Sequence, residues 1–345
     1  MPRNPILQVA PAVLLSLAFL SVGTSRELLA QSVVVYSALD REFSEPVLKA
    51  YGRESGVRVL PKFDVESTKT VGLTNLIVAE AVRPRCDLFW NNEILNTLRL
   101  KEKGLLAPFH PTGATDLPTT FQDKDGFWYG FAARARILIV NTKLVAMSDR
   151  PKGIKDLLDP RWKDQIGIAK PLFGTTATQA ACLFVAWGEE KGKQFFKDLK
   201  SNDVHVFSGN KQVATAVGSG QIAFGLTDTD DAMGEVDAGS PVAIIYPDRD
   251  PDALGTLFIP NTLAIIKGAP HEKEAQALAD YLLRPKVEEA LASGPSAQIP
   301  LLRTTKTEAR VETPKTVHAM DVDFEAAAKI WDKVAAFLIE EYAGG

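Results

Sequence analysis

The feature that most constrains the fold is a regular alternation of short apolar segments and longer amphipathic ones near the start of the chain. Residues 32–36 (SVVVY) predict a strand, and a helix over 42–55 follows directly. A strand over 57–63, a helix over 69–81 and a strand over 87–90 continue the pattern. Strands that alternate with helices through short connections pair in parallel, in a sheet that helices cover on both faces. We therefore predict an α/β fold built on a doubly wound sheet.

Two longer strand-like runs divide the chain, one over 127–141 (FWYGFAARARILIVN) and one over 257–266 (LFIPNTLAII). The alternation restarts between them and continues beyond the second run, with strands predicted over 166–169, 204–207 and 222–226 and helices over 175–188, 191–199, 210–219, 271–283 and 323–342. We interpret the two runs as strands that cross between two lobes, lobe 1 comprising residues 32–132 and 262–345, and lobe 2 comprising residues 133–261. A cleft between two such lobes is where small ligands bind.

Composition limits the partners of the chain. Its 345 residues, 46% hydrophobic and 24% charged, are enough for two ordinary globular domains. The net charge of −4 argues against a nucleic acid as the main partner, because phosphate binding needs a basic surface. The two cysteines, Cys86 and Cys182, both lie in apolar stretches, which favours buried free thiols; a disulfide between them is the alternative.

The N-terminus has the pattern of a secretory signal peptide. Arg3 is followed by a continuous apolar run over residues 12–22, and a small residue, Ala30, ends the segment. The apolar run is too short to span a bilayer. We expect residues 1–30 to be removed and the mature protein to be periplasmic or secreted. A buried N-terminal helix is the alternative.

Several turns that open predicted helices carry groups suited to an anion. The N–H groups at the start of a helix have no partner within the helix and attract negative charge. Helix capping alone is the alternative explanation for the same residue types. The residues that we single out on this ground are Ser37, Ala38, Asp40, Gly174, Thr175, Thr176 and Asn210.

Three carboxylates within four positions, Asp228, Asp230 and Asp231, follow the strand predicted over 222–226. Because like charges repel, this cluster favours a bound cation, either a metal ion or an ammonium group. The alternative is a solvated acidic loop that caps the next helix. The Asp-x-Asp pattern is also found in phosphatases of the haloacid-dehalogenase type, but there it begins the catalytic domain, whereas here it comes late in the chain.

A further group of polar residues is expected near the cleft because each follows the end of a strand or lies on a crossing strand. Two arginines, Arg134 and Arg136, lie on the crossing strand. An ion pair with Asp or Glu within the protein explains their presence as well as an anionic ligand does. The members assigned to the site are Glu66, Ser67, Asn92, Glu93 and Arg136.

The chain resembles the periplasmic solute-binding proteins of ABC importers, specifically the ferric-iron-binding-protein family with the type II binding-protein fold. The resemblance rests on VVVYSA at 33–38, the stretches 79–80 and 87–90, RARILIVN at 134–141, GTT at 174–176 and residues 210–226. It implies a two-lobed fold, each lobe a doubly wound sheet with flanking helices, joined by a hinge of two crossing strands.

The resemblance also shows a departure. Iron binders of this family use a His, a Glu and two adjacent Tyr, and these positions fall at Asp40, Glu80 and Asp230–Asp231 here. Loss of the tyrosines, with the anion-side residues retained, implies a ligand with an anionic head and a cationic end, such as 2-aminoethylphosphonate. The alternative is ferric iron or another hard cation bound by Asp40, Glu80, Asp230 and Asp231. A secreted Asp-dependent phosphatase is the alternative from another class.

We therefore predict a binding protein and not an enzyme, with no cofactor unless a metal ion is its ligand. Its partners are a small-molecule ligand and the permease of an ABC importer, and we expect it to be a monomer.

Overall fold

The computed structural model describes Met1 and residues 31–64 and 70–342. Two lobes are built on two sheets that share one long strand, β5 (Tyr129–Asn141). In the first lobe, β1 pairs in parallel with β2 and β3, and β10 joins that sheet to β5. The bounds are β1 (Ser32–Ser37), β2 (Arg58–Phe63), β3 (Leu88–Asn91), β4 (Leu106–Ala107), which pairs with β10, and β10 (Phe258–Ile266).

The second lobe continues from the other half of β5. There β5 pairs with β8 and β9, and β8 leads through β6 to β7. The bounds are β6 (Ile166–Ala169), β7 (His205–Phe207), β8 (Phe224–Asp228) and β9 (Val242–Ile245). The two-lobed α/β fold with crossing strands, as predicted, is confirmed. The exact lobe boundaries remain a prediction.

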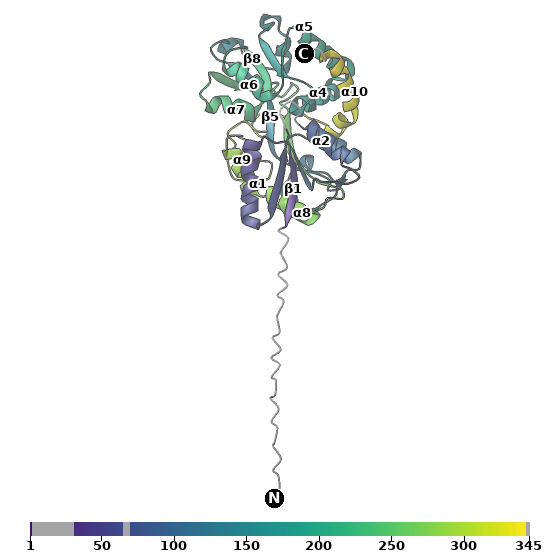
Figure 1. Ribbon diagram of the computed structural model, residues 1–345. Helices are drawn as coiled ribbons and strands as arrows, with labels where there is room; N and C mark the ends of the chain where they lie inside the picture. Colours follow the sequence, from purple (N-terminus) through teal and green to yellow (C-terminus); the bar gives the residue numbers. More distant parts are fainter. Residues whose placement is uncertain (2–30, 65–69, 343–345) are drawn as a thin grey trace.

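The helices cover the two sheets (Figure 1). Those that follow strands of the first lobe are α1 (Arg41–Ser55), α2 (Val71–Ala79), α3 (Leu95–Glu102), α8 (Glu272–Leu282) and α9 (Pro285–Ser293). Those of the second lobe are α4 (Gly174–Trp187), α5 (Glu189–Ser201), α6 (Asn210–Gly218) and α7 (Thr229–Asp237). Among the described residues, none of the helices is long and apolar enough to cross a membrane.

Strand β5 changes partners in its middle. Its first half pairs with β10 as far as Ala135, and its second half pairs with β8 from Arg136 onward. The register with β10 shifts between Ile259 and Asn261, on either side of Pro260, which has no N–H to donate to a sheet. The changeover brings polar side chains of β5 to the junction of the lobes.

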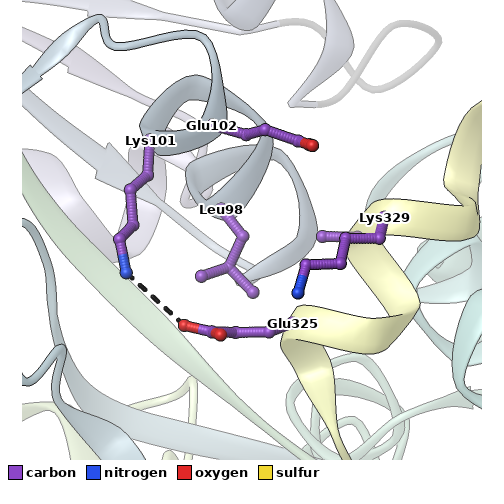
Figure 2. Close-up of a pocket in the computed structure, with 6 residues that line it drawn as sticks. Leu98, Lys101, Glu102, Glu325 and Lys329 are labelled. Carbon is purple, nitrogen blue, oxygen red and sulfur yellow. Dashed lines mark hydrogen bonds and ion pairs between the residues drawn. The ribbon is translucent and has the colours of Figure 1, made fainter.

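The C-terminal helix α10 (Phe324–Tyr342) contacts both lobes, with α3 on one side and α4 and α5 on the other. Trp331 and Leu338 are buried in these contacts, and Asp332 pairs with Arg99 at 2.9 Å. Figure 2 shows a pocket of ≈ 220 Å³ between α3 and α10, lined by Leu98, Lys101, Glu102, Glu325, Ala328 and Lys329. The sequence did not predict this bridging position.

Both cysteines are free and buried in the structure. Burial raises the pKa of the Cys86 thiol and of the Cys182 thiol. A buried thiol that holds its proton is a small apolar group and a poor nucleophile.

Candidate functional site

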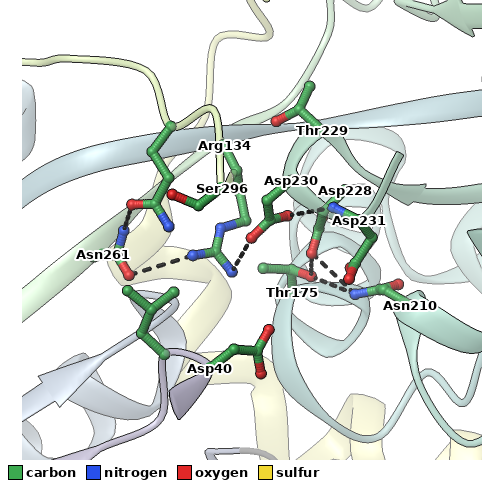
Figure 3. A network of polar contacts seen from close by, with 12 residues as sticks. Asp40, Arg134, Thr175, Asn210, Asp228, Thr229, Asp230, Asp231, Asn261 and Ser296 are labelled. Carbon is green, nitrogen blue, oxygen red and sulfur yellow. Dashed lines mark hydrogen bonds and ion pairs between the residues drawn. The ribbon is translucent and has the colours of Figure 1, made fainter. Parts of the chain in front are cut away.

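The candidate site lies where the middle of β5, the end of β8 and the starts of three helices of the second lobe meet the start of α1 (Figure 3). Asp228 ends β8 and precedes α7, which begins at Thr229. Helices α4 and α6 begin at Gly174 and Asn210. Gly174 has φ = +55°, a conformation that glycine adopts with little strain. Several helix N-termini therefore converge on the carboxyl end of a strand, the usual place for a ligand in an α/β sheet.

The first of two buried ion pairs in the site joins Arg136 and Asp228. Nη1 of Arg136 lies 2.7 Å from Oδ1 of Asp228, and both side chains are almost fully buried. The guanidinium also donates through Nε to Gln179 at 2.8 Å and through Nη2 to Thr176 at 3.2 Å. Every nitrogen of Arg136 thus has a partner, so this pair satisfies itself within the protein.

The residues predicted for an anion surround this pair. Thr175 Oγ1 donates to Asp228 Oδ2 at 2.5 Å, and Asn210 Nδ2 donates to the same oxygen at 3.0 Å. Thr176 Oγ1 donates to Asn210 Oδ1 at 3.1 Å. The hydroxyl protons of both threonines are therefore directed at side chains of the protein.

The second ion pair, between Arg134 and Asp230, is looser. Nη1 of Arg134 lies 3.4 Å from Oδ2 of Asp230, and Nη2 donates to Asn261 Oδ1 at 3.3 Å. The Nε atom of Arg134 is buried with no hydrogen-bond partner among the described residues. A buried charged group that lacks a hydrogen bond destabilises the fold. A ligand that accepts a hydrogen bond from this donor would remove that cost.

Charge around Arg134 is dominated by carboxylates. Burial by itself would lower the pKa of Arg134, but Asp230, with Asp228, Asp40 and Asp231 after it, raises that pKa. Among the described residues, the four carboxylates and Glu42 stand against Arg134, Arg136 and Lys211, whose pKa Glu42, Asp40 and Asp231 raise. The balance of these described charges is negative. Such a site favours a ligand that brings positive charge.

A family model described as bacterial extracellular solute-binding protein matches residues 85–329, most of the chain. The chain belongs to this family. Its members are solute-binding components of ABC importers.

Three known proteins that this chain is similar to are named or described with different ligands. The major ferric iron-binding protein of Neisseria meningitidis serogroup B is 24% identical over 272 residues, which cover 76% of this chain and 78% of the relative. A periplasmic protein of Salmonella paratyphi A, provisionally named for binding 2-aminoethylphosphonate, is 23% identical over 189 residues, 54% of each chain.

The third is the periplasmic binding protein AfuA of Actinobacillus pleuropneumoniae, solved with fructose 6-phosphate bound. It superposes with a TM-score of 0.81 at 20% identity, over 91% of this chain and 99% of that one. This likeness shows the fold alone.

The solute-binding protein holds three carboxylates close enough to share a cation. Oxygen atoms of Asp228, Asp230 and Asp231 all lie within 4.8 Å of one another. Glu80, also named for the metal alternative, accepts a hydrogen bond from Tyr36 at 2.9 Å and lies 3.9 Å from Arg85. The metal alternative named four residues. Asp230 and Asp231 belong to this group of three carboxylates, whereas Asp40 and Glu80 do not.

The predicted residues of the first lobe lie at the other side of the junction. Ser37 is buried and its Oγ donates to the carbonyl of Leu39 at 3.3 Å, while the N–H of Ala38 donates to that of Trp90 at 2.9 Å. Asn92 is 2% exposed and its Oδ1 has no partner among the described residues. Glu66 and Ser67 lie outside the described residues.

Glu93 links the two lobes through a fully buried carboxyl group. It accepts hydrogen bonds from Asn91 Nδ2 at 2.9 Å and from the N–H of Asn96, at the start of α3, at 3.0 Å. Thr178 Oγ1, on α4 of the other lobe, donates to it at 2.8 Å. Burial raises the pKa of Glu93, and these hydrogen bonds limit the rise.

Three residues beside the site were missed. Asn261 contacts Arg134, Gln179 contacts Arg136, and Thr229 Oγ1 accepts from the N–H of Ala135 at 3.1 Å. Asn261 interrupts the apolar run over 257–266. A polar side chain in a buried strand needs a polar partner, and this was the signal available in the sequence.

Proposed function

We propose that this protein is the periplasmic solute-binding component of an ABC importer whose ligand combines a cationic end with an anionic head. 2-Aminoethylphosphonate is the first candidate. The observation that carries the proposal is the acidic group Asp228, Asp230 and Asp231 beside Arg134, at the convergent starts of several helices. A binding protein needs such convergent polar groups and no catalytic residue.

The cationic end is assigned to the carboxylates that face Arg134. Asp230 is 3% exposed and Asp231 is half-buried, so both are largely removed from bulk water. The interaction of an ammonium group with carboxylates is stronger there than at the surface. Asp40, at the start of α1 in the first lobe, belongs to the same electrostatic group.

The anionic head is assigned to Arg134 and to helix N-termini. Nε of Arg134 is the buried donor without a described partner. Helices α1 and α7 begin without a side-chain cap bond among the described residues, which leaves backbone N–H groups of their first turns for an oxyanion.

Closure around the ligand is the signal that a permease reads. In the structure the lobes already touch at the rim of the site, where Lys211 of α6 pairs with Glu42 of α1 at 2.9 Å. Both side chains are exposed, so the contact forms and breaks at little cost.

A hard cation such as ferric iron is the second candidate, favoured by the three clustered carboxylates. Two of these carboxylates are paired with arginines. A metal ion therefore competes with guanidinium groups for its ligands, and for this reason we place it second.

A thermal-shift screen of the mature protein tests the proposal. The panel is 2-aminoethylphosphonate, ethanolamine, ferric citrate, fructose 6-phosphate and putrescine. A ligand present at a hundred times its Kd stabilises the fold by about 2.7 kcal/mol. We expect the aminophosphonate to raise Tm most, and stabilisation by ferric citrate alone would favour the second candidate. Magnesium-dependent hydrolysis of a phosphate ester would contradict both.

A further inference from the structure

The carboxylate of Asp228 occupies a position that has the chemistry of an anion-binding site. Its side chain is 3% exposed. Three donors from three different elements reach it: Arg136 from β5 at 2.7 Å, Thr175 from the start of α4 at 2.5 Å, and Asn210 from the start of α6 at 3.0 Å. A guanidinium, a hydroxyl and an amide at two helix starts are the groups that proteins use to hold a carboxylate or phosphate.

The residues that donate to Asp228 are also hydrogen-bonded to one another and to neighbouring side chains. Asn210 Nδ2 donates to Thr175 Oγ1 at 2.9 Å, and Thr176 Oγ1 donates to Asn210 Oδ1 at 3.1 Å. Gln179, one turn into α4, holds Nε of Arg136 at 2.8 Å. Arg136 and Asn210 thus have contacts that do not involve Asp228, whereas the hydroxyl proton of Thr175 is directed at Asp228 alone.

We propose that Asp228 is an internal anion, a specificity-determining residue that fills the anion position between α4 and α6. The position is therefore closed to the anionic group of a solute. The neighbouring region around Arg134, Asp230 and Asp231 is then the part of the site that is left to bind the charged groups of a solute. This inference rests on the contacts of Asp228 and stands whether or not the ligand is an aminophosphonate.

Rescue by a small anion separates this role from that of an ordinary structural ion pair. Asp228→Ala removes the carboxylate and leaves room for acetate or inorganic phosphate. Asp228→Asn is the matched control, because it removes the charge but keeps the side-chain volume. Thermal unfolding is followed for the wild type and both variants in acetate, in phosphate and in chloride at equal ionic strength.

We expect acetate to raise the Tm of Asp228→Ala saturably, with an affinity at least tenfold above that for Asp228→Asn, and chloride to have no such effect. The wild type should show no saturable response. An Asp228→Ala variant that unfolds at the same Tm in acetate and in chloride would overturn the proposal.

The wild-type protein provides a second test that does not depend on the folding of a variant. Calorimetric titration with inorganic phosphate should give no saturable binding at this position. If phosphate binds the wild type and Thr175→Val, which removes one donor, abolishes that binding, then Asp228 does not close the position and the proposal is wrong.

Discussion

The site holds two arginine–aspartate pairs, in which the two arginines and the two aspartates are each two positions apart in the sequence. The pairs differ in how many of the guanidinium nitrogens have a hydrogen-bond partner. Arg134 and Arg136 are two positions apart on β5, so they lie on the same face of the strand. Arg136 lies 2.7 Å from Asp228, and all its nitrogens are bonded. Arg134 lies 3.4 Å from Asp230 and keeps a buried Nε without a described partner.

The difference comes from the neighbours of each pair. Arg136 is surrounded by residues of α4 and α6 within one lobe. Arg134 stands at the changeover of β5, where the first lobe contributes β10 on one side and the second lobe contributes α7 on the other. A pair enclosed by one lobe can be saturated permanently, whereas a pair beside the changeover of β5 keeps capacity for a ligand.

The largest effect is expected when the saturated pair is broken. Arg136→Leu leaves Asp228 buried without its counter-charge and should reduce the free energy of unfolding by about 3–5 kcal/mol, measured by urea denaturation. The double variant Arg136→Leu/Asp228→Leu should recover a large part of this loss, because no charge is then left unpaired. A loss below about 1 kcal/mol for Arg136→Leu would show that the pair behaves like an exposed one.

The looser pair is expected to matter for binding. Asp230→Asn keeps the shape of the side chain and removes its charge, so it should weaken binding of a cation-bearing ligand at least tenfold, about 1.4 kcal/mol. Calorimetry measures the affinity, and Asp252→Asn, at an exposed position, is the control for net charge. Equal affinities of the two variants would mean that Asp230 does not contact the charged end.

The contact of Glu93 with the second lobe is expected to make the stability of the protein depend on pH. Its folded-state pKa is raised above 4.5, so the folded state holds the proton more tightly than the unfolded state. This contribution to stability is present below pH 4.5 and is lost as the pH rises through the folded-state pKa.

The matching variant is Glu93→Gln, which cannot ionise. Its stability relative to the wild type should therefore shift in its favour as the pH rises, by less than the effect of breaking the Arg136 pair. Urea denaturation between pH 4 and 7 measures this. A difference that is constant with pH, or that shifts the other way, would contradict the assignment.

The smallest effect is expected at the rim. Lys211→Ala removes the exposed pair with Glu42, and such pairs contribute about 0.2–1 kcal/mol. Ligand affinity should fall by about fivefold at most, and high salt should abolish the difference, since salt screens exposed charges. Persistence of the difference at high salt would indicate a packing role for the lysine.

The sequence predicted the architecture well because the architecture depends on local patterns. The runs over 127–141 and 257–266 are apolar almost throughout, and they form β5 and β10. A helix was expected after the acidic stretch, but its bounds were not predicted, because its first turn, Thr229-Asp230-Asp231, has the composition of a loop. Acidic residues suit the first turn of a helix, where they face its positive end.

The candidate site residues were chosen from the sequence, but their pairing was not predicted, and their role in binding stays a prediction. Asp228 meets Arg136 across 92 positions of sequence, and Glu93 meets Thr178 across 85. Such partners are brought together by the crossing strands and by packing, which local periodicity does not reveal. Glu93 was assigned to the cleft because it follows the end of a strand, and its contact with Thr178 of the other lobe could not be predicted from that position.

Calorimetric titration with a matched pair of ligands tests the central claim most directly. 2-Aminoethylphosphonate and ethylphosphonate share the anionic head and differ by one ammonium group. If the carboxylates around Arg134 recognise positive charge, the aminophosphonate should bind at least tenfold more tightly, a difference of about 1.4 kcal/mol. Equal or tighter binding of ethylphosphonate would contradict the account.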